Sequence, residues 1–203
     1  TTSGYTSTTN NTDDADDFTI VGNGKTRAID IAANDSAKAV ARKVNSVAGA
    51  TNVFAQARTY LHLASSTSTS ANYQLRINGT STASFAISST DVSDAVSKIN
   101  AIFATTGVMA TATTENKILL SDADGDDIIV RNASAGTNLT VSAVKSDGVT
   151  EAGTLRTLSA SGAEVAKVDV ADVYAAYLKW ANGGSPAAAG SLQTTFNGNT
   201  VTL

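Results

Sequence analysis

Residues 34–45 read NDSAKAVARKVN, and 55 positions further on residues 89–100 read STDVSDAVSKIN. Both stretches place apolar residues three and four positions apart, which is the spacing of one face of an α-helix. This spacing predicts two amphipathic helices in the same register. The first apolar face consists of Ala37, Val40, Ala41, Val44, Val47 and Ala48, and the second consists of Val92, Ala95, Val96, Ile99, Ile102 and Phe103.

The residues at the ends of the two stretches are typical of helix boundaries. Asp35 stands where the first helix requires an N-cap, and Thr90 or Asp91 can cap the second helix. Gly49 follows the first apolar face, so we expect it to end the first helix.

Similar β-rich runs flank both predicted helices. Before them, FTIVGNGKTRAIDIAA (18–33) and YQLRINGTSTASFAIS (73–88) each hold an Asn-Gly pair between two runs, which is typical of a hairpin. After them, NVFAQARTYLHLAS (52–65) and GVMATATTENKILLSDADG (107–125) again read as paired strands, with two extra residues in the second turn. The chain is therefore predicted to be an α+β protein made of tandem β-β-α-β-β units, with one amphipathic helix packed on a small antiparallel sheet in each unit.

This repeat predicts four regions along the chain. Residues 1–17 are polar and rich in aspartate near their end, which favours a linker or loop. The first unit covers 18–66 and the second covers 72–146, with two further strands expected within 128–146. Residues 147–203 are expected to form a C-terminal helix, because Val170, Val173, Tyr174, Tyr177 and Leu178 lie at helical spacing, and a closing hairpin at LQTTFNGNTVTL.

Composition narrows the functional classes. The chain has 42% hydrophobic but only 5% aromatic residues, a net charge of −4 and no cysteine. Nucleic acids and anionic membranes require concentrated positive charge, so we expect neither as a partner. The absence of cysteine excludes disulfides and thiol chemistry. Ser and Thr make up about a quarter of the chain, which favours a secreted surface protein, and the start at Thr1 leads us to expect a piece of a longer protein.

The sequence favours a non-enzymatic protein without a cofactor. His62 is the single histidine and lies in the strand-like run YLHLA, where neither a catalytic triad nor a metal cluster can be assembled around it. Carboxylates occur in turns throughout the chain, and no pair stands in an aromatic-lined setting that would favour a glycosidase.

Two other patterns leave alternatives open. The acidic run DADGDD contains Asp122, Asp124, Asp126 and Asp127 and is a candidate calcium site, although a plain acidic turn between two strands is favoured over it. Tyr174, Tyr177 and Trp180 could form a sugar-stacking surface, but their helical spacing favours core packing. Glycosylation sequons begin at Asn10, Asn34, Asn78, Asn132 and Asn138.

The repeated unit resembles the insertion motif in the outer domains of bacterial flagellins, which also occurs in filament cap and hook-associated proteins. The second copy carries the resemblance best, with Asn78-Gly79, Thr90-Asp91, Ala95-Val96, Lys98-Ile99-Asn100-Ala101, Gly107-Val108, Ala110, Ala112 and Lys117-Ile118-Leu119-Leu120-Ser121. The first copy keeps Ala39-Val40, Lys43-Val44-Asn45, Val53, Ala55 and Ala57. The resemblance covers roughly residues 18–130, and the heptad-patterned terminal helices through which flagellins polymerise are not present in this sequence.

The resemblance implies the variable, surface-exposed outer region of a flagellin, displayed on an extracellular flagellar filament. Its partners would be neighbouring flagellin subunits and glycans on exposed Ser or Thr, and the isolated chain is expected to be a monomer. An inserted region must leave and re-enter its parent, so residues 13–20 and 196–203 are expected to be neighbours. The alternatives are an outer domain of a cap or hook-associated protein, and a repeat module of a bacterial surface adhesin.

Overall fold

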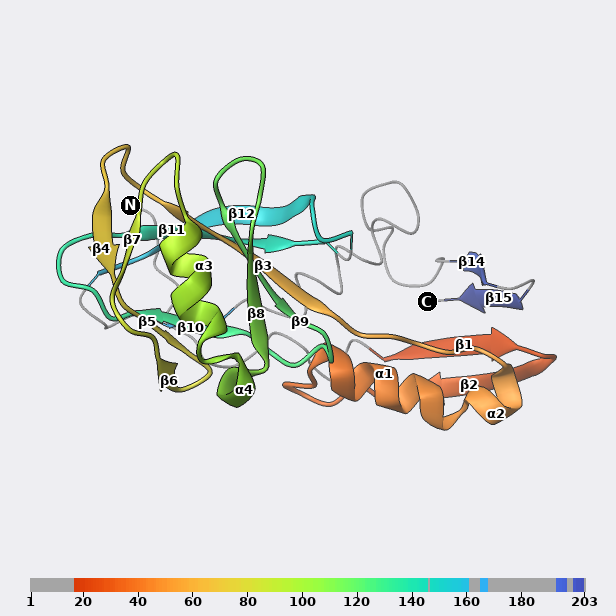
Figure 1. Cartoon of the computed structure of the whole chain (residues 1–203). Coiled ribbons are helices and arrows are strands. Elements are labelled where there is room, and N and C mark those ends of the chain that lie inside the picture. The colour runs from red at the N-terminus through yellow and green to blue at the C-terminus, as the bar shows by residue number, and fades with distance from the viewer. Residues whose placement is uncertain (1–16, 146, 161–164, 168–192, 197–198, 203) are drawn as a thin grey trace.

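The computed structural model describes residues 17–145, 147–160, 165–167, 193–196 and 199–202 (Figure 1). Helices and antiparallel strands are mixed along the chain, so the predicted α+β class is confirmed. The N-terminal lobe consists of residues 18–58, and the body begins at residue 59. Figure 1 shows the lobe projecting from one end of the body.

The N-terminal lobe is a hairpin covered by helices. Strands β1 (Phe18–Gly22) and β2 (Lys25–Ile29) pair antiparallel, followed by α1 (Ala37–Ser46) and the short α2 (Ala48–Thr51). The apolar face of α1 packs against the hairpin, as the spacing of its residues predicts. The lobe's buried core consists of Ile20, Ile29, Ile31, Val40, Val44 and Val53.

The body is built on a five-stranded antiparallel sheet. Its strands lie in the order β12 (Glu151–Leu158), β11 (Leu139–Val144), β3 (Thr59–Ser65), β9 (Ile118–Asp122) and β8 (Val108–Ala112). A second sheet has the order β13 (Val165–Lys167), β10 (Ile129–Asn132), β5 (Leu75–Ile77) and β6 (Thr80–Ser81), and β4 (Ala71–Tyr73) pairs with β7 (Phe85–Ile87).

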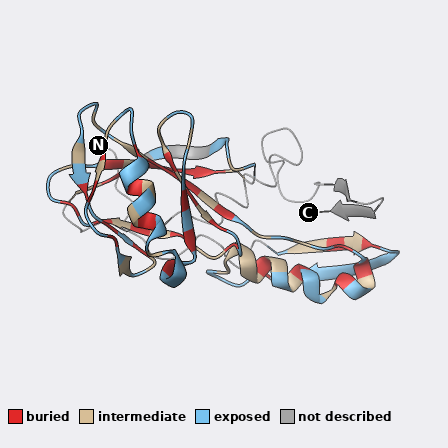
Figure 2. Ribbon diagram, viewed as in Figure 1, coloured by how far each residue is buried: buried red, intermediate tan, exposed pale blue. Residues whose placement is uncertain are grey.

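Helix α3 (Ser93–Asn100) lies against β7 and β8 and is followed by the short α4 (Phe103–Thr106). Its face buries Ala95 and Ile99 in one core shared by both sheets. Figure 2 shows buried ribbon, in red, along strands of the body and on part of α3. Aromatic residues contribute little to this core apart from Tyr73 and Phe85, whose stacked ring centroids are 6.4 Å apart.

The internal repeat is visible in backbone detail. Both predicted Asn-Gly turns form, with positive φ at Asn23 and Gly24 and again at Asn78 and Gly79. Helices α2 and α4 begin and end 55 residues apart. Each is followed by a residue of positive φ, Asn52 at 57° and Gly107 at 72°.

The two units differ after their helices. In the second unit β8 turns back into β9, as predicted. In the first unit residues 53–57 form no strand, and the chain continues through Arg58 into β3, so the hairpin expected around Arg58 and Thr59 is wrong. Strand β3 lies between β9 and β11 in the body sheet, so no break between sheets separates residues 18–66 from 72–146.

Several predicted helix boundaries are also wrong. Ser36 caps α1 by accepting a hydrogen bond from the Ala39 N–H at 3.3 Å, whereas Asp35 binds the Ala32 N–H. The N-cap of α3 is Val92, with no side-chain cap bond, although Asp91 accepts from the Ser93 N–H at 2.8 Å.

Two residues near the C-terminal ends of the predicted helices also depart from expectation. Gly49 lies inside α2 instead of ending α1, because α1 stops earlier, at Ser46. Phe103, expected on the buried face of the second helix, is 43% exposed because α3 ends before it and α4 begins a new turn there.

The closing hairpin is confirmed as β14 (Gln193–Phe196) paired with β15 (Asn199–Thr202), whereas the C-terminal helix expected from Val170 to Leu178 lies outside the described residues. Cα atoms of β15 lie within 8 Å of those of β1, so the described parts of the two end segments are neighbours. They belong to separate two-stranded sheets and share no ladder.

Candidate interaction surfaces

Each unit ties its helix to the following segment through one asparagine. The Asn100 amide donates to the Ala110 carbonyl at 2.9 Å and accepts from the Ala110 N–H at 2.8 Å. Asn45 makes the same pair of bonds with Ala55, at 2.9 and 2.8 Å. In the body this closes the outer edge of β8 at its centre, because those two groups would otherwise face solvent or another strand.

The acidic run lies where the lobe meets the body. Asp122 is buried and its Oδ1 accepts from the N–H groups of Asp124 and Asp126, at 2.9 and 3.1 Å. Lys38 Nζ, from the first turn of α1, bonds the carboxylates of Asp124 and Asp126 at 3.3 and 2.6 Å. These ion pairs raise the pKa of Lys38, with Asp126 contributing most.

The same loop contacts the lobe through its backbone. The Lys38 N–H donates to the Gly125 carbonyl at 3.0 Å. Gly125 has a φ of +80°, and a Cβ there would lie 2.3 Å from Cβ of Ala57. Asp122 therefore bonds the backbone, and Asp124 and Asp126 bond Lys38. Within the described ranges, no group of three or more metal-ligating side chains is found.

A groove of about 300 Å³ runs beside this junction, between α1 and residues 55–58. Its lining includes Lys38, Arg42, Asn45 and Arg58. Neither guanidinium has an ion-pair partner among the described side chains. These basic residues are separated in the sequence, and the packing of α1 against residues 55–58 brings them together.

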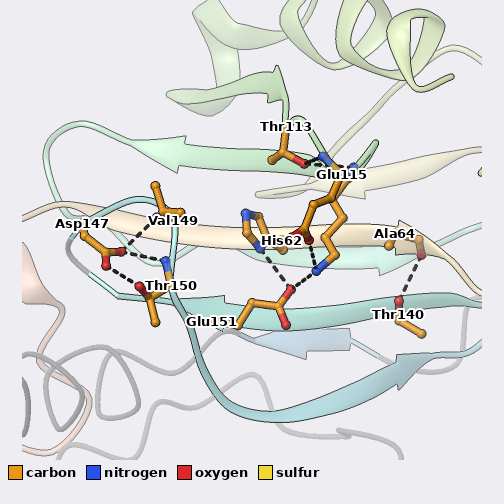
Figure 3. A network of polar contacts seen from close by, with 10 residues as sticks. His62, Ala64, Thr113, Glu115, Thr140, Asp147, Val149, Thr150 and Glu151 are labelled. Carbon is orange, nitrogen blue, oxygen red and sulfur yellow. Dashed lines mark hydrogen bonds and ion pairs between the residues drawn. The ribbon is translucent and has the colours of Figure 1, made fainter. Parts of the chain in front are cut away.

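His62 lies inside a charged network on the body sheet (Figure 3). Its Nδ1 is 3.1 Å from Glu151 Oε1, which also accepts from Lys117 Nζ at 2.7 Å. An ionised carboxylate cannot donate, so Nδ1 carries the hydrogen of this bond. His62 Nε2 is buried and has no hydrogen-bond partner in the described structure.

Glu151 and Lys117 shift each other's pKa in the directions that favour their charged forms. The Lys117 hydrogen bond holds the pKa of Glu151 below its ordinary value of 4.5, against the opposing effect of partial burial. Reciprocally, Glu151 and then Glu115 raise the pKa of Lys117. Ser142 lies opposite His62 in the sheet. Its hydroxyl is buried and bonds neither ring nitrogen of His62, so Ser142, His62 and Glu151 do not present an accessible nucleophile.

Sequence comparison gives no relative for this arrangement: no family model matches the chain, and no curated protein matches it either. Within the described ranges, none of the helices has the length and apolarity needed to cross a membrane.

The asparagines of the sequons, most of which are expected to be chance matches, lie in very different settings. Asn132 is fully buried and its amide donates to the carbonyls of Thr137 and Leu158, so a glycan cannot be attached there in the folded state. Asn78 joins α4 to β10 through Thr106 and Ile129. Asn34 and Asn138 are exposed, whereas Asn10, Tyr174, Tyr177 and Trp180 lie outside the described residues.

Proposed function

We propose that this chain is the outer, surface-exposed region of a bacterial flagellin and has a structural rather than an enzymatic role. The repeated motif resembles flagellin insertion motifs, and its two copies make the same helix-to-segment bonds 55 residues apart. As a region inserted in a filament subunit, it would lie on the outside of an extracellular flagellum and set its surface chemistry, diameter and antigenicity.

The observation that carries the proposal is the proximity of β1 and β15. A region inserted into a parent domain must have its entry and exit close together, whereas a linear array of surface modules has no such requirement. Neighbouring subunits would be its partners, and exposed Ser and Thr would carry any glycans.

Immunogold electron microscopy with an antibody raised against this chain tests the proposal on cells of the source organism. Gold along the whole filament is the expected result, with antibody pre-absorbed on the purified chain as the control. Gold confined to the filament tip or hook junction would assign the chain to a cap or hook-associated protein. Label on the cell body alone would replace the proposal by a surface adhesin.

A further inference from the structure

In the second unit, β8 is bonded on one edge by Asn100 and on its other edge by strand β9. Ala110 directs its N–H and C=O to Asn100. Backbone groups alternate in direction along an extended strand, so the flanking residues Met109 and Thr111 direct theirs to β9. One side of β8 is thus held by a helix side chain and the other by a strand.

Among the described strands, none takes that place in the first unit. We call residues 53–57 the open segment, because Ala55 is held by Asn45 just as Ala110 is held by Asn100. The counterparts of Met109 and Thr111 are Phe54 and Gln56, and among the described residues neither makes a backbone hydrogen bond. Phe54 is also 67% exposed, the second most exposed of the large apolar side chains described.

The chain cannot supply the missing strand from the equivalent position. The strand that would fold back on the open segment is β3, and both edges of β3 are already paired, with β9 and β11. Only Arg58 separates the open segment from β3, whereas five residues separate β8 from β9, so the chain continues forward instead of reversing.

Charge indicates what would occupy the position. Residues 18–58 contain six lysines and arginines and two aspartates, a net charge of +4, whereas residues 1–17 and residues 59–203 each carry −4. Arg42 and Arg58 line the groove next to the open segment without ion-pair partners in the described structure. Two lobes would repel each other, but a lobe and the body of a second copy attract.

We propose that the open segment is a strand-addition site for a second copy of this chain, which contributes an extended segment from its residues 59–203. The contact is head-to-tail, because the two surfaces differ, and such contacts extend into open arrays. Few backbone groups take part, so association is weak in dilute solution and becomes significant where copies are held together. This inference does not rest on the flagellar proposal.

Site-specific cross-linking tests it directly, because the chain contains no cysteine and one introduced thiol is unique. Phe54→Cys carrying a benzophenone label, mixed with unlabelled chain at high concentration, should give covalent dimers with the attachment in residues 59–203. Met109→Cys is the matched control, since it lies at the equivalent position where β9 is already present. Added salt should reduce the Phe54→Cys yield by screening the charges.

A backbone substitution separates strand addition from simple adhesion of Phe54. Gln56→Pro, introduced into the labelled chain, removes one donor from the open edge and should reduce the cross-link yield several-fold, whereas Gln56→Ala should not. Thermal unfolding by circular dichroism checks that both variants fold. Yields no higher than with Met109→Cys, attachment within residues 18–58, or equal yields from the Pro and Ala variants would each overturn the proposal.

Discussion

Asn45 and Asn100 lie 55 residues apart and make the same two hydrogen bonds, each holding both backbone groups of the alanine ten residues further along the chain. The bonded alanines differ in burial, since Ala110 is 1% exposed and Ala55 is half-buried. The same pair of asparagine bonds therefore covers the edge of a sheet strand in the body, whereas in the lobe it holds the open segment.

Removing the amide of Asn100 should destabilise the body. Asn100→Ala leaves the N–H and C=O of Ala110 unpaired, so we expect a loss of about 1–3 kcal/mol in the free energy of unfolding. Urea unfolding measures this loss, and light scattering should show more aggregation because the edge of β8 is uncovered. Asn45→Ala is the matched variant and should cost less, because Ala55 has more access to water. Equal losses in both variants would contradict this account.

Gly125 should not tolerate a side chain. Gly125→Ala places a methyl group 2.3 Å from Cβ of Ala57 at a φ of +80°, so the acidic loop or the lobe must move. Gly136→Ala is the control, because Gly136 has a φ of +91° with open space around its Cβ position. We expect Gly125→Ala to lower the unfolding free energy by about 1–3 kcal/mol more than Gly136→Ala. Similar midpoints in thermal unfolding would mean that this close approach is absent in solution.

Loss of the Lys38 ammonium should weaken the junction between lobe and body. Lys38→Met removes both ion pairs to the acidic loop, and the resulting decrease in Tm should shrink as salt rises, because salt screens surface charges. Lys98→Met changes a lysine of α3 that has no ion pair in the described structure and should leave Tm nearly unchanged. A Lys38→Met decrease that does not depend on salt would indicate that the methylene chain matters more than the charge.

Calcium should have no specific effect on stability. The carboxylates of Asp124 and Asp126 face Lys38, and Asp122 accepts from the backbone. We therefore expect the same Tm with added Ca²⁺ and with a chelator. An increase in Tm with Ca²⁺ that disappears in Asp126→Asn would show that calcium displaces the lysine and would restore the calcium site as an interpretation.

The network of Figure 3 should make stability depend on pH in the acid range. The pKa of Glu151 is lower in the folded chain than its ordinary value, so its contribution is present above about pH 4.5 and is lost as the pH falls through the folded value. Lys117→Met removes the main cause of the lowered pKa and should flatten this part of the curve. Urea unfolding from about pH 6 to about pH 3 measures it, and parallel curves for the two chains would refute the assignment.

Much of the local structure can be predicted from the sequence. The helical spacing of apolar residues identifies α1 and α3, and the Asn-Gly pairs identify the turns at Asn23 and Asn78, because these signals act between residues close in the chain. Exact helix ends are less predictable. Two adjacent residues, Asp35 and Ser36, both carry a side-chain oxygen that can cap a helix, and the sequence does not decide between them. In the structure Ser36 caps α1.

The candidate surfaces are harder to predict, because they join distant parts of the chain. DADGDD is visible as an acidic run, but its partner Lys38 is more than 80 residues away. His62 is recognisable as a lone histidine, yet only sheet register brings it to Glu151.

The sequence by itself therefore determined the repeated unit, its helices and its turns, all of which depend on contacts within a few residues. The tertiary structure alone decided where β3 belongs. Two units of equal local pattern could each have kept their own last strand, but Leu61 and Leu63 are fully buried between β9 and β11 in the core of the body. That burial of apolar side chains is a property of the whole sheet, and it leaves residues 53–57 without a partner among the described strands.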